Sequence, residues 1–124
     1  MKLRWALVLL VAATAAAEHR VIFPPGAKPV GPYSPGILAG DFLYVSGQGV
    51  RTPDGQIPAT LEAQVTQCLE NVKTIVEAAG LTMEHVVYTH VYLDNPANYD
   101  TINRVYARYF PQNPPARADR KSVV

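Results

Sequence analysis

Cysteine and histidine are scarce in this sequence, and their scarcity removes several classes of chemistry. The 124 residues include one cysteine, Cys68, and three histidines at positions 19, 85 and 90, without ligand-like spacing to carboxylates. We therefore expect neither an internal disulfide nor a metal site. The sequence also lacks a Gly-x-Ser-x-Gly elbow and a glycine-rich phosphate loop, which argues against triad hydrolases and nucleotide-binding proteins.

Charge of either sign is also limited. Asp, Glu, Lys and Arg make up 17% of the chain, and the formal net charge is +1. This balance provides no basic surface for a polyanion, so we expect no nucleic-acid partner. The hydrophobic content of 48% suits one globular domain with an ordinary core.

The N-terminal segment has the layout of a secretory signal peptide. Two basic residues precede an apolar run at 5–13, and alanines at 15–17 offer a small-residue cleavage site. The run is shorter than the roughly 20 residues that span a bilayer, which disfavours the alternative of a membrane anchor. We predict a signal peptide at 1–17 and one domain at 18–124, exported to the periplasm or secreted. Cleavage would change the formal net charge from +1 to −1 and leave no stable membrane anchor.

Hydrophobic periodicity predicts an α+β domain. Short β-rich runs bounded by Gly and Pro alternate with two segments whose apolar residues recur at helical spacing. This order predicts a two-layer sandwich, with two helices on one face of a mixed sheet. The predicted elements are a strand at 19–23, a hairpin at 36–47, a helix capped by Thr60 and Gly80, a strand at 85–93, and a helix from Asn95 to Phe110.

Several reactive or polar side chains on these elements are interpreted as structural. Cys68 lies on the apolar stripe of the first predicted helix, so a buried role is favoured over a nucleophilic one. The polar face of that helix is interpreted as solvated, and the tyrosine stripe of the second helix as core. On the strand at 85–93, Tyr88, His90 and Tyr92 share one face. We expect His90 to pack rather than act as a base, and this face to meet another subunit.

The segment NPPAR at 113–117 carries the most distinctive candidate binding residue. Two prolines stiffen the approach to Arg117, whose planar guanidinium can hold a carboxylate through two parallel hydrogen bonds. A surface or subunit-bridging arginine is the alternative. The spacing of the segment alone slightly favours this alternative.

Four blocks of the sequence resemble one known family. GPYSPGILAGDFLYVSGQ, EAQVTQCLENVKTIVEAAGL, YDTINRVYARYF and PPAR occur in this order. Together they resemble the Rid family of reactive intermediate deaminases, also called the YjgF-type or endoribonuclease L-PSP family, over residues 20–117. The resemblance implies a chorismate-mutase-like α+β fold and a homotrimer with a central barrel and pockets between subunits. It also implies hydrolysis of imine and enamine acids, such as 2-iminopropanoate and 2-aminoacrylate, to 2-oxo acids and ammonia, without a metal or organic cofactor.

The resemblance also assigns roles to individual residues. It implies that Arg117 clamps the substrate carboxylate and that Tyr33 lines the pocket, and these two are the expected catalytic residues. Ser46 and Gly47 would supply backbone contacts to the substrate, and Asn103 would shape the neighbouring wall. The GPYSPG loop and the VSGQ strand end would thus form one wall of an anion pocket, with arginine on the other side.

The chain departs from the family pattern after Arg117. It reads ADRKSVV, whereas the family continues with a strand, a turn and a second strand that carries a catalytic glutamate. We therefore expect the C-terminal strands and this acid to be missing, and the apolar-poor segment 118–124 not to form a strand. Asp119 is the candidate replacement acid, provided that its segment is extended.

These observations leave three functions in order of preference. The first is an imine and enamine deaminase, or a descendant of one that loss of the C-terminal acid impairs. The second is a non-catalytic binder of small carboxylates or a holdase-like trimer, which needs no acid or base beside Arg117. The third is the endoribonuclease activity that gives part of the family its name, which the low net charge disfavours.

Overall fold

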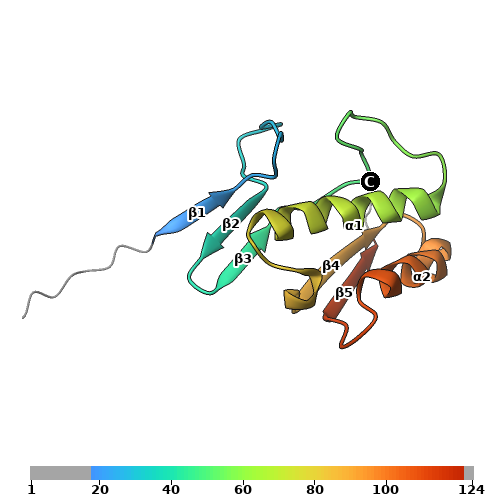
Figure 1. Ribbon diagram of the computed structural model, residues 1–124. Helices are drawn as coiled ribbons and strands as arrows, with labels where there is room; N and C mark the ends of the chain where they lie inside the picture. The colour runs from blue at the N-terminus through green and yellow to red at the C-terminus, as the bar shows by residue number, and fades with distance from the viewer. Residues whose placement is uncertain (1–17, 122–124) are drawn as a thin grey trace, which may run out of the picture.

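The computed structural model describes residues 18–121, so the predicted signal peptide at 1–17 and the last three residues lie outside the described part. Within this described part, five strands and two long helices make an α+β domain, which confirms the predicted fold class (Figure 1). In chain order the elements are β1 (His19–Ile22), β2 (Gly36–Ala39), β3 (Phe42–Val45), α1 (Leu61–Ala78), the short 3-10 helix η1 (Met83–His85), β4 (Tyr88–Leu93), the 3-10 helix η2 (Pro96–Asn98), α2 (Tyr99–Tyr109) and β5 (Ala116–Lys121).

The first three strands form an antiparallel sheet. Strand β2 is central and pairs with β1 on one side and β3 on the other. The β2–β3 hairpin turns through Gly40 and Asp41, and Gly40 has a φ of +57°. A positive φ at the first of two turn residues is typical of the type II′ hairpin, which explains the glycine at this position.

Helix α1 begins and ends at the residues that the sequence predicts. The Thr60 side chain accepts a hydrogen bond from the Ala63 amide at 3.2 Å. At the other end Gly80 has a φ of +81°, its amide donates to the Glu77 carbonyl at 2.9 Å, and the Leu81 amide donates to the Val76 carbonyl at 3.1 Å. This pair of bonds is a Schellman motif, which satisfies carbonyls that the helix itself leaves free.

Two predictions about the sheet are wrong. The strands form two sheets instead of one mixed sheet, because β4 pairs only with β5 among the described residues. Residues 116–121 form strand β5, although their sequence lacks an apolar run. Parallel pairing with β4 through backbone hydrogen bonds does not depend on side chains, and it begins where the Ala116 amide donates to the Val87 carbonyl at 3.1 Å.

The core lies between the helices and the inner faces of the strands. Helix α1 runs across both sheets, and α2 packs beside it over β4 and β5 (Figure 1). Val105 of α2 is fully buried, and Tyr106 beside it is 7% exposed, as expected for a core tyrosine. Tyr99, at the start of the same stripe, is 42% exposed and lies at the edge. The buried residues are Ile22, Ile75, Val76, Ile102, Val105, Tyr106 and Phe110.

The polar face of α1 is not simply solvated, which corrects another prediction. The Glu62 carboxylate pairs with Arg108 of α2 at 2.8 Å and with Arg104 at 3.9 Å. The Tyr109 hydroxyl donates to the Glu70 carboxylate at 2.6 Å. Burial and the neighbouring Glu70 raise the pKa of Tyr109 to about 12. These acidic side chains therefore help to dock α2 onto α1.

The strand faces that point away from the helices carry exposed aromatic side chains. Along β4, exposed and partly buried residues alternate, and Tyr88 and Tyr92 on the outer face are 56% and 63% exposed. His90 packs edge-on between their rings, and its Nε2 lies 2.7 Å from the Tyr88 hydroxyl. On β3 the outward Phe42 and Tyr44 are 61% and 62% exposed. A single copy thus leaves the outer aromatic faces of both sheets open to solvent.

Within 18–121 no helix combines the length and the apolar character needed to cross a bilayer.

Candidate functional site

Arg117 lies on the inner face of β5, where the strand faces α2. Its register partner on β4 is Thr89, whose hydroxyl lies 2.8 Å from that of the core residue Tyr106. Because side chains alternate along a strand, Arg117 and Asp119 point to this same face. The strand therefore brings a cation and an anion together under the helix.

The Arg117 guanidinium is held by several hydrogen bonds. Its Nε and Nη2 atoms lie 3.0 and 3.1 Å from the two carboxylate oxygens of Asp119, which is the paired geometry of an arginine fork. Nη2 also donates to the Asn103 side-chain oxygen at 2.7 Å and to the Tyr99 hydroxyl at 3.3 Å. Within residues 18–121, Nη1 makes no hydrogen bond that would occupy its two protons.

Aromatic rings of α2 fix the plane of the same guanidinium. The Arg117 Cζ atom lies 4.7 Å from the centroid of Tyr106 and 5.6 Å from that of Tyr99. The side chain of Arg117 is 16% exposed. This arginine is therefore a fixed, largely covered group with one donor nitrogen left for a ligand, and not a loose surface residue.

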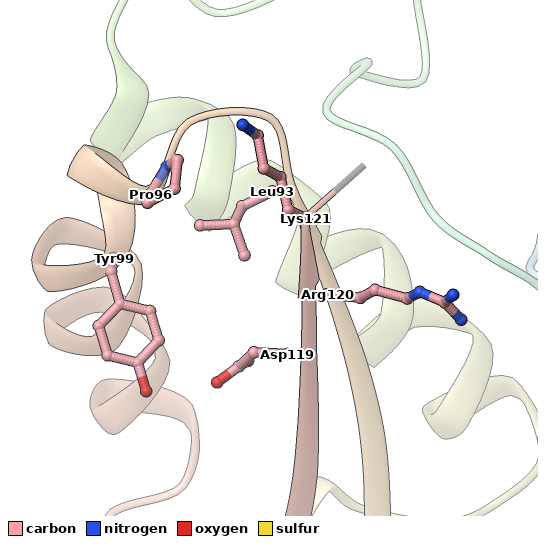
Figure 2. A pocket seen from close by; sticks show the side chains of 6 residues that line it. All are labelled: Leu93, Pro96, Tyr99, Asp119, Arg120 and Lys121. Carbon is pink, nitrogen blue, oxygen red and sulfur yellow. The ribbon is translucent and has the colours of Figure 1, made fainter. Parts of the chain in front are cut away.

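A shallow hollow of about 380 Å³ is lined by two contact partners of Arg117, Tyr99 and Asp119. Tyr99 and Asp119 project into it from α2 and β5, while Arg120 points to the other side of the strand (Figure 2). Leu93 and Pro96 contribute apolar surface, and Lys121 lies at its upper end. Both polar residues that project into the hollow also contact the guanidinium, so the hollow lies beside Arg117, one side chain away from it.

The remaining predicted site residues gather around the start of β2 and the end of β3. The Ser46 hydroxyl donates to the Ser34 carbonyl at 2.6 Å, and the Ser46 amide donates to the Pro35 carbonyl at 2.9 Å. The Tyr33 ring is 54% exposed and lies against Gly31, where a Cβ would come within 2.7 Å of the ring. No heavy atom lies within 4 Å of a Cβ placed on Gly47. The GPYSPG loop and the VSGQ strand end therefore contact each other, and the Tyr33 ring is exposed beside them.

The two groups of predicted site residues are separate within one copy of the chain. Tyr33, Ser46 and Gly47 belong to the β1–β3 end of the molecule, whereas Asn103 and Arg117 belong to α2 and β5. No hydrogen bond or ion pair among residues 18–121 joins the two groups. The structure therefore places each predicted residue but assembles the arginine half and the tyrosine half apart.

Cys68 is a partly buried free thiol on α1. The Cys68 thiol donates to the Gln48 carbonyl at 3.2 Å, and burial raises its pKa, which suppresses the nucleophilic thiolate. Within residues 18–121 no three His, Cys, Asp or Glu side chains are arranged to hold a metal ion. The organised polar chemistry on the α2 side is therefore that of Arg117.

Two contacts of Arg117 were not foreseen from the sequence. Tyr99 and Tyr106 were assigned only to the core stripe, yet both rings lie against the guanidinium. Together with Asn103 they follow a spacing of four and then three residues, which places them on one face of a helix. This spacing, together with an arginine on the following strand, was the sequence signal that could have predicted these contacts.

Comparison with known proteins gives one consistent result. Residues 25–120 match the sequence profile of a family described as Endoribonuclease L-PSP. A RutC family protein of Saccharolobus solfataricus is 42% identical over 100 residues, which cover 78% of this chain and 79% of that protein.

Solved structures agree with the sequence match. The crystal structure of E. coli TdcF with bound serine is similar with a TM-score of 0.78 and 32% identity, over 83% of this chain and 85% of that one. The crystal structure of RidA from the Antarctic bacterium Psychrobacter sp. is similar with a TM-score of 0.77 and 30% identity, over 83% and 85%.

Proposed function

The chain belongs to the Rid family, also described as Endoribonuclease L-PSP, and from that premise we propose that it is a hydrolytic deaminase of small imine and enamine acids. The substrate class is that of 2-aminoacrylate and its tautomer 2-iminopropanoate. The products are a 2-oxo acid and ammonia, and the reaction needs no cofactor.

One observation carries this proposal, namely the fixed guanidinium of Arg117. Its plane is set by the Tyr106 ring at 4.7 Å, and its Nη2 atom is held by Asn103 at 2.7 Å. Such an arginine loses little conformational freedom when it binds a carboxylate. The relative TdcF was solved with bound serine, a small acid of the same size class, which supports a ligand of this kind.

The proposed reaction requires few catalytic groups from the protein. Water adds to the imine carbon to give a carbinolamine, a proton moves to nitrogen, and the C–N bond breaks to release ammonia and leave a C=O bond. The imine carbon is already electrophilic, so holding the carboxylate on Arg117 and placing one water supplies much of the acceleration. Tyr33 is the proposed second catalytic residue, with Ser46 and Gly47 as backbone contacts.

We further propose that the complete site forms between subunits of a homotrimer. A single copy keeps the Tyr33 half apart from the Arg117 half and leaves Tyr44 and Tyr92 exposed on outer strand faces. Burial of those faces against neighbouring copies would remove apolar surface from water. It would also allow the Tyr33 loop of one copy to reach the arginine of the next.

The deaminase proposal is tested by following 2-iminopropanoate generated in situ and trapped as its semicarbazone. The protein should accelerate loss of the imine, Arg117→Ala should abolish the acceleration, and Arg117→Lys should leave a small part of it. Arg104→Ala is the matched control, because Arg104 lies on α2 and its contacts are Glu62 and Thr101. No acceleration by the folded protein, or equal loss in Arg104→Ala and Arg117→Ala, would overturn the proposal.

A second candidate function is a non-catalytic binder of small carboxylates. The crystal structure of the relative TdcF with bound serine favours it, because serine is a small carboxylate without an imine to hydrolyse. Binding of L-serine without any effect on the decay of 2-iminopropanoate would select this function over the deaminase.

A further inference from the structure

Asp119 is the charged hydrogen-bond partner of the Arg117 guanidinium. Its two oxygens lie 3.0 and 3.1 Å from Nε and Nη2, and its side chain is 27% exposed. The other two hydrogen-bond partners of the guanidinium, Asn103 and Tyr99, are neutral. Within residues 18–121, the pair of Arg117 and Asp119 therefore carries no net charge.

This neutral pair has a direct consequence for ligands. A carboxylate that approaches Nη1 is attracted by Arg117 but repelled by Asp119 on the opposite edge of the same guanidinium. Because the site is partly covered, solvent screens neither contribution completely. A simple anion therefore gains less from this arginine than it would from an unpaired one.

A ligand with a protonated nitrogen beside its carboxylate meets a different situation. Asp119 projects into the 380 Å³ hollow, so its outward lone pairs can accept a hydrogen bond from that nitrogen (Figure 2). The Tyr99 hydroxyl lies on the same side of the hollow and can accept another. Such a ligand presents an anion to Arg117 and a cation to Asp119, and both charges are matched.

We propose that Asp119 is a specificity-determining residue, which makes the site select small acids with a protonated amino or imino nitrogen over acids that lack one. This inference rests on the proposed function, since it assigns the ligand carboxylate to Arg117. In a deaminase this selectivity would favour release of the product. Asp119 attracts the protonated nitrogen of the iminium substrate, whereas the 2-oxo acid product has lost that nitrogen and its carboxylate is repelled.

The test compares two probes of nearly equal size by titration calorimetry. L-Serine carries an ammonium group where glycerate carries a hydroxyl, and both have one carboxylate. We expect the wild-type chain to bind L-serine at least tenfold more tightly than glycerate, since a hydrogen bond to a charged partner contributes on the order of tenfold or more. Asp119→Asn should bind glycerate more tightly than the wild type and L-serine more weakly, which removes the preference.

Asp119→Glu, which keeps the carboxylate, is the control that separates loss of the charge from misfolding of the variant. Asp119→Glu should keep the preference for L-serine, and thermal unfolding and circular dichroism should show Asp119→Asn to be folded. An unchanged ratio of the two dissociation constants in folded Asp119→Asn would overturn the proposal. So would a wild-type chain that binds glycerate as well as L-serine, or that binds no L-serine.

Failure of the proposed function gives different results from failure of the selectivity proposal. Lys121 is a second cation at the hollow, so the carboxylate assignment is tested with Arg117→Lys and Lys121→Gln. If only Lys121→Gln weakens both probes, the carboxylate binds Lys121 and not Arg117, which removes the support for the proposed function and overturns the placement on which this inference rests. Absence of turnover with an intact L-serine preference, and with affinity lost in Arg117→Lys, would instead reject the deaminase alone and retain the selectivity.

Discussion

Removal of the Asn103 side chain tests whether the helix positions the arginine for ligand binding. The Arg117 Nη2 atom has two protons, and three acceptors lie near it: Asn103 at 2.7 Å, Asp119 at 3.1 Å and Tyr99 at 3.3 Å. Asn103 makes the shortest of these contacts and is the one that ties the guanidinium to the middle of α2. Asn103→Ala should therefore free the guanidinium to turn away from the ligand.

The expected size of the effect follows from the contacts that remain. A hydrogen bond to a charged group contributes about 1.5–3 kcal/mol, and the lower end applies here because Asp119 and Tyr99 can take over the freed proton. About 1.5 kcal/mol corresponds to about a tenfold rise in the dissociation constant of L-serine. Calorimetric titration of the folded variant measures this change.

The matched control uses an asparagine at the N-terminus of the same helix. The Asn98 side chain contacts Asp94 at 3.5 Å, and none of the hydrogen bonds of Arg117 involves it. Asn98→Ala should bind L-serine within about twofold of the wild type, which is less than 0.5 kcal/mol. Equal affinities of Asn103→Ala, Asn98→Ala and the wild type would refute the positioning argument.

Three further predictions concern the framework that supports the site. Tyr109→Phe removes the 2.6 Å hydrogen bond to Glu70 and should lower the free energy of unfolding by about 1 kcal/mol in urea denaturation. Because the pKa of Tyr109 is raised to about 12, the contribution of its hydroxyl to the free energy of unfolding should be fully present below pH 10 and should be lost as the pH rises through 12. Tyr109→Phe should therefore lose less stability than the wild type over that range. Equal losses in the two proteins would contradict the hydrogen bond between Tyr109 and Glu70. Val105→Ala opens a cavity at a fully buried position and should cost about 2 kcal/mol, and a cost below 0.5 kcal/mol would contradict its place in the core. Gly80→Ala should cost about 1 kcal/mol because φ is +81°, and an unchanged midpoint would argue against the Schellman end of α1.

Local signals in the sequence were sufficient for most of the fold. Thr60 and Gly80 bound the long helix because capping depends on neighbours within a few residues. The Gly40 turn likewise determines its own hairpin. Strand β5 was missed because its pairing with β4 comes from a partner 28 positions away in register, and ADRK carries no local β pattern.

The candidate site was predictable in part for the same reason. Arg117 stood out because two prolines and a family-like PPAR segment mark it locally. Asp119 was recognised only as a candidate acid, since its ion pair with Arg117 depends on both residues lying in an extended strand. The tyrosines that face the guanidinium looked like ordinary core, because their second role exists only once α2 crosses β5.

The proposed site between subunits is tested most directly by complementation of two defective variants. Tyr33→Ala damages one half of the site and Arg117→Ala the other, so each alone should lose the acceleration of 2-iminopropanoate decay. In trimers assembled from an equal mixture, about a quarter of the interfaces would pair an intact Tyr33 with an intact Arg117. We predict that the mixture recovers about that fraction of wild-type activity. Mixed trimers that form but stay inactive would contradict a site shared between neighbouring chains.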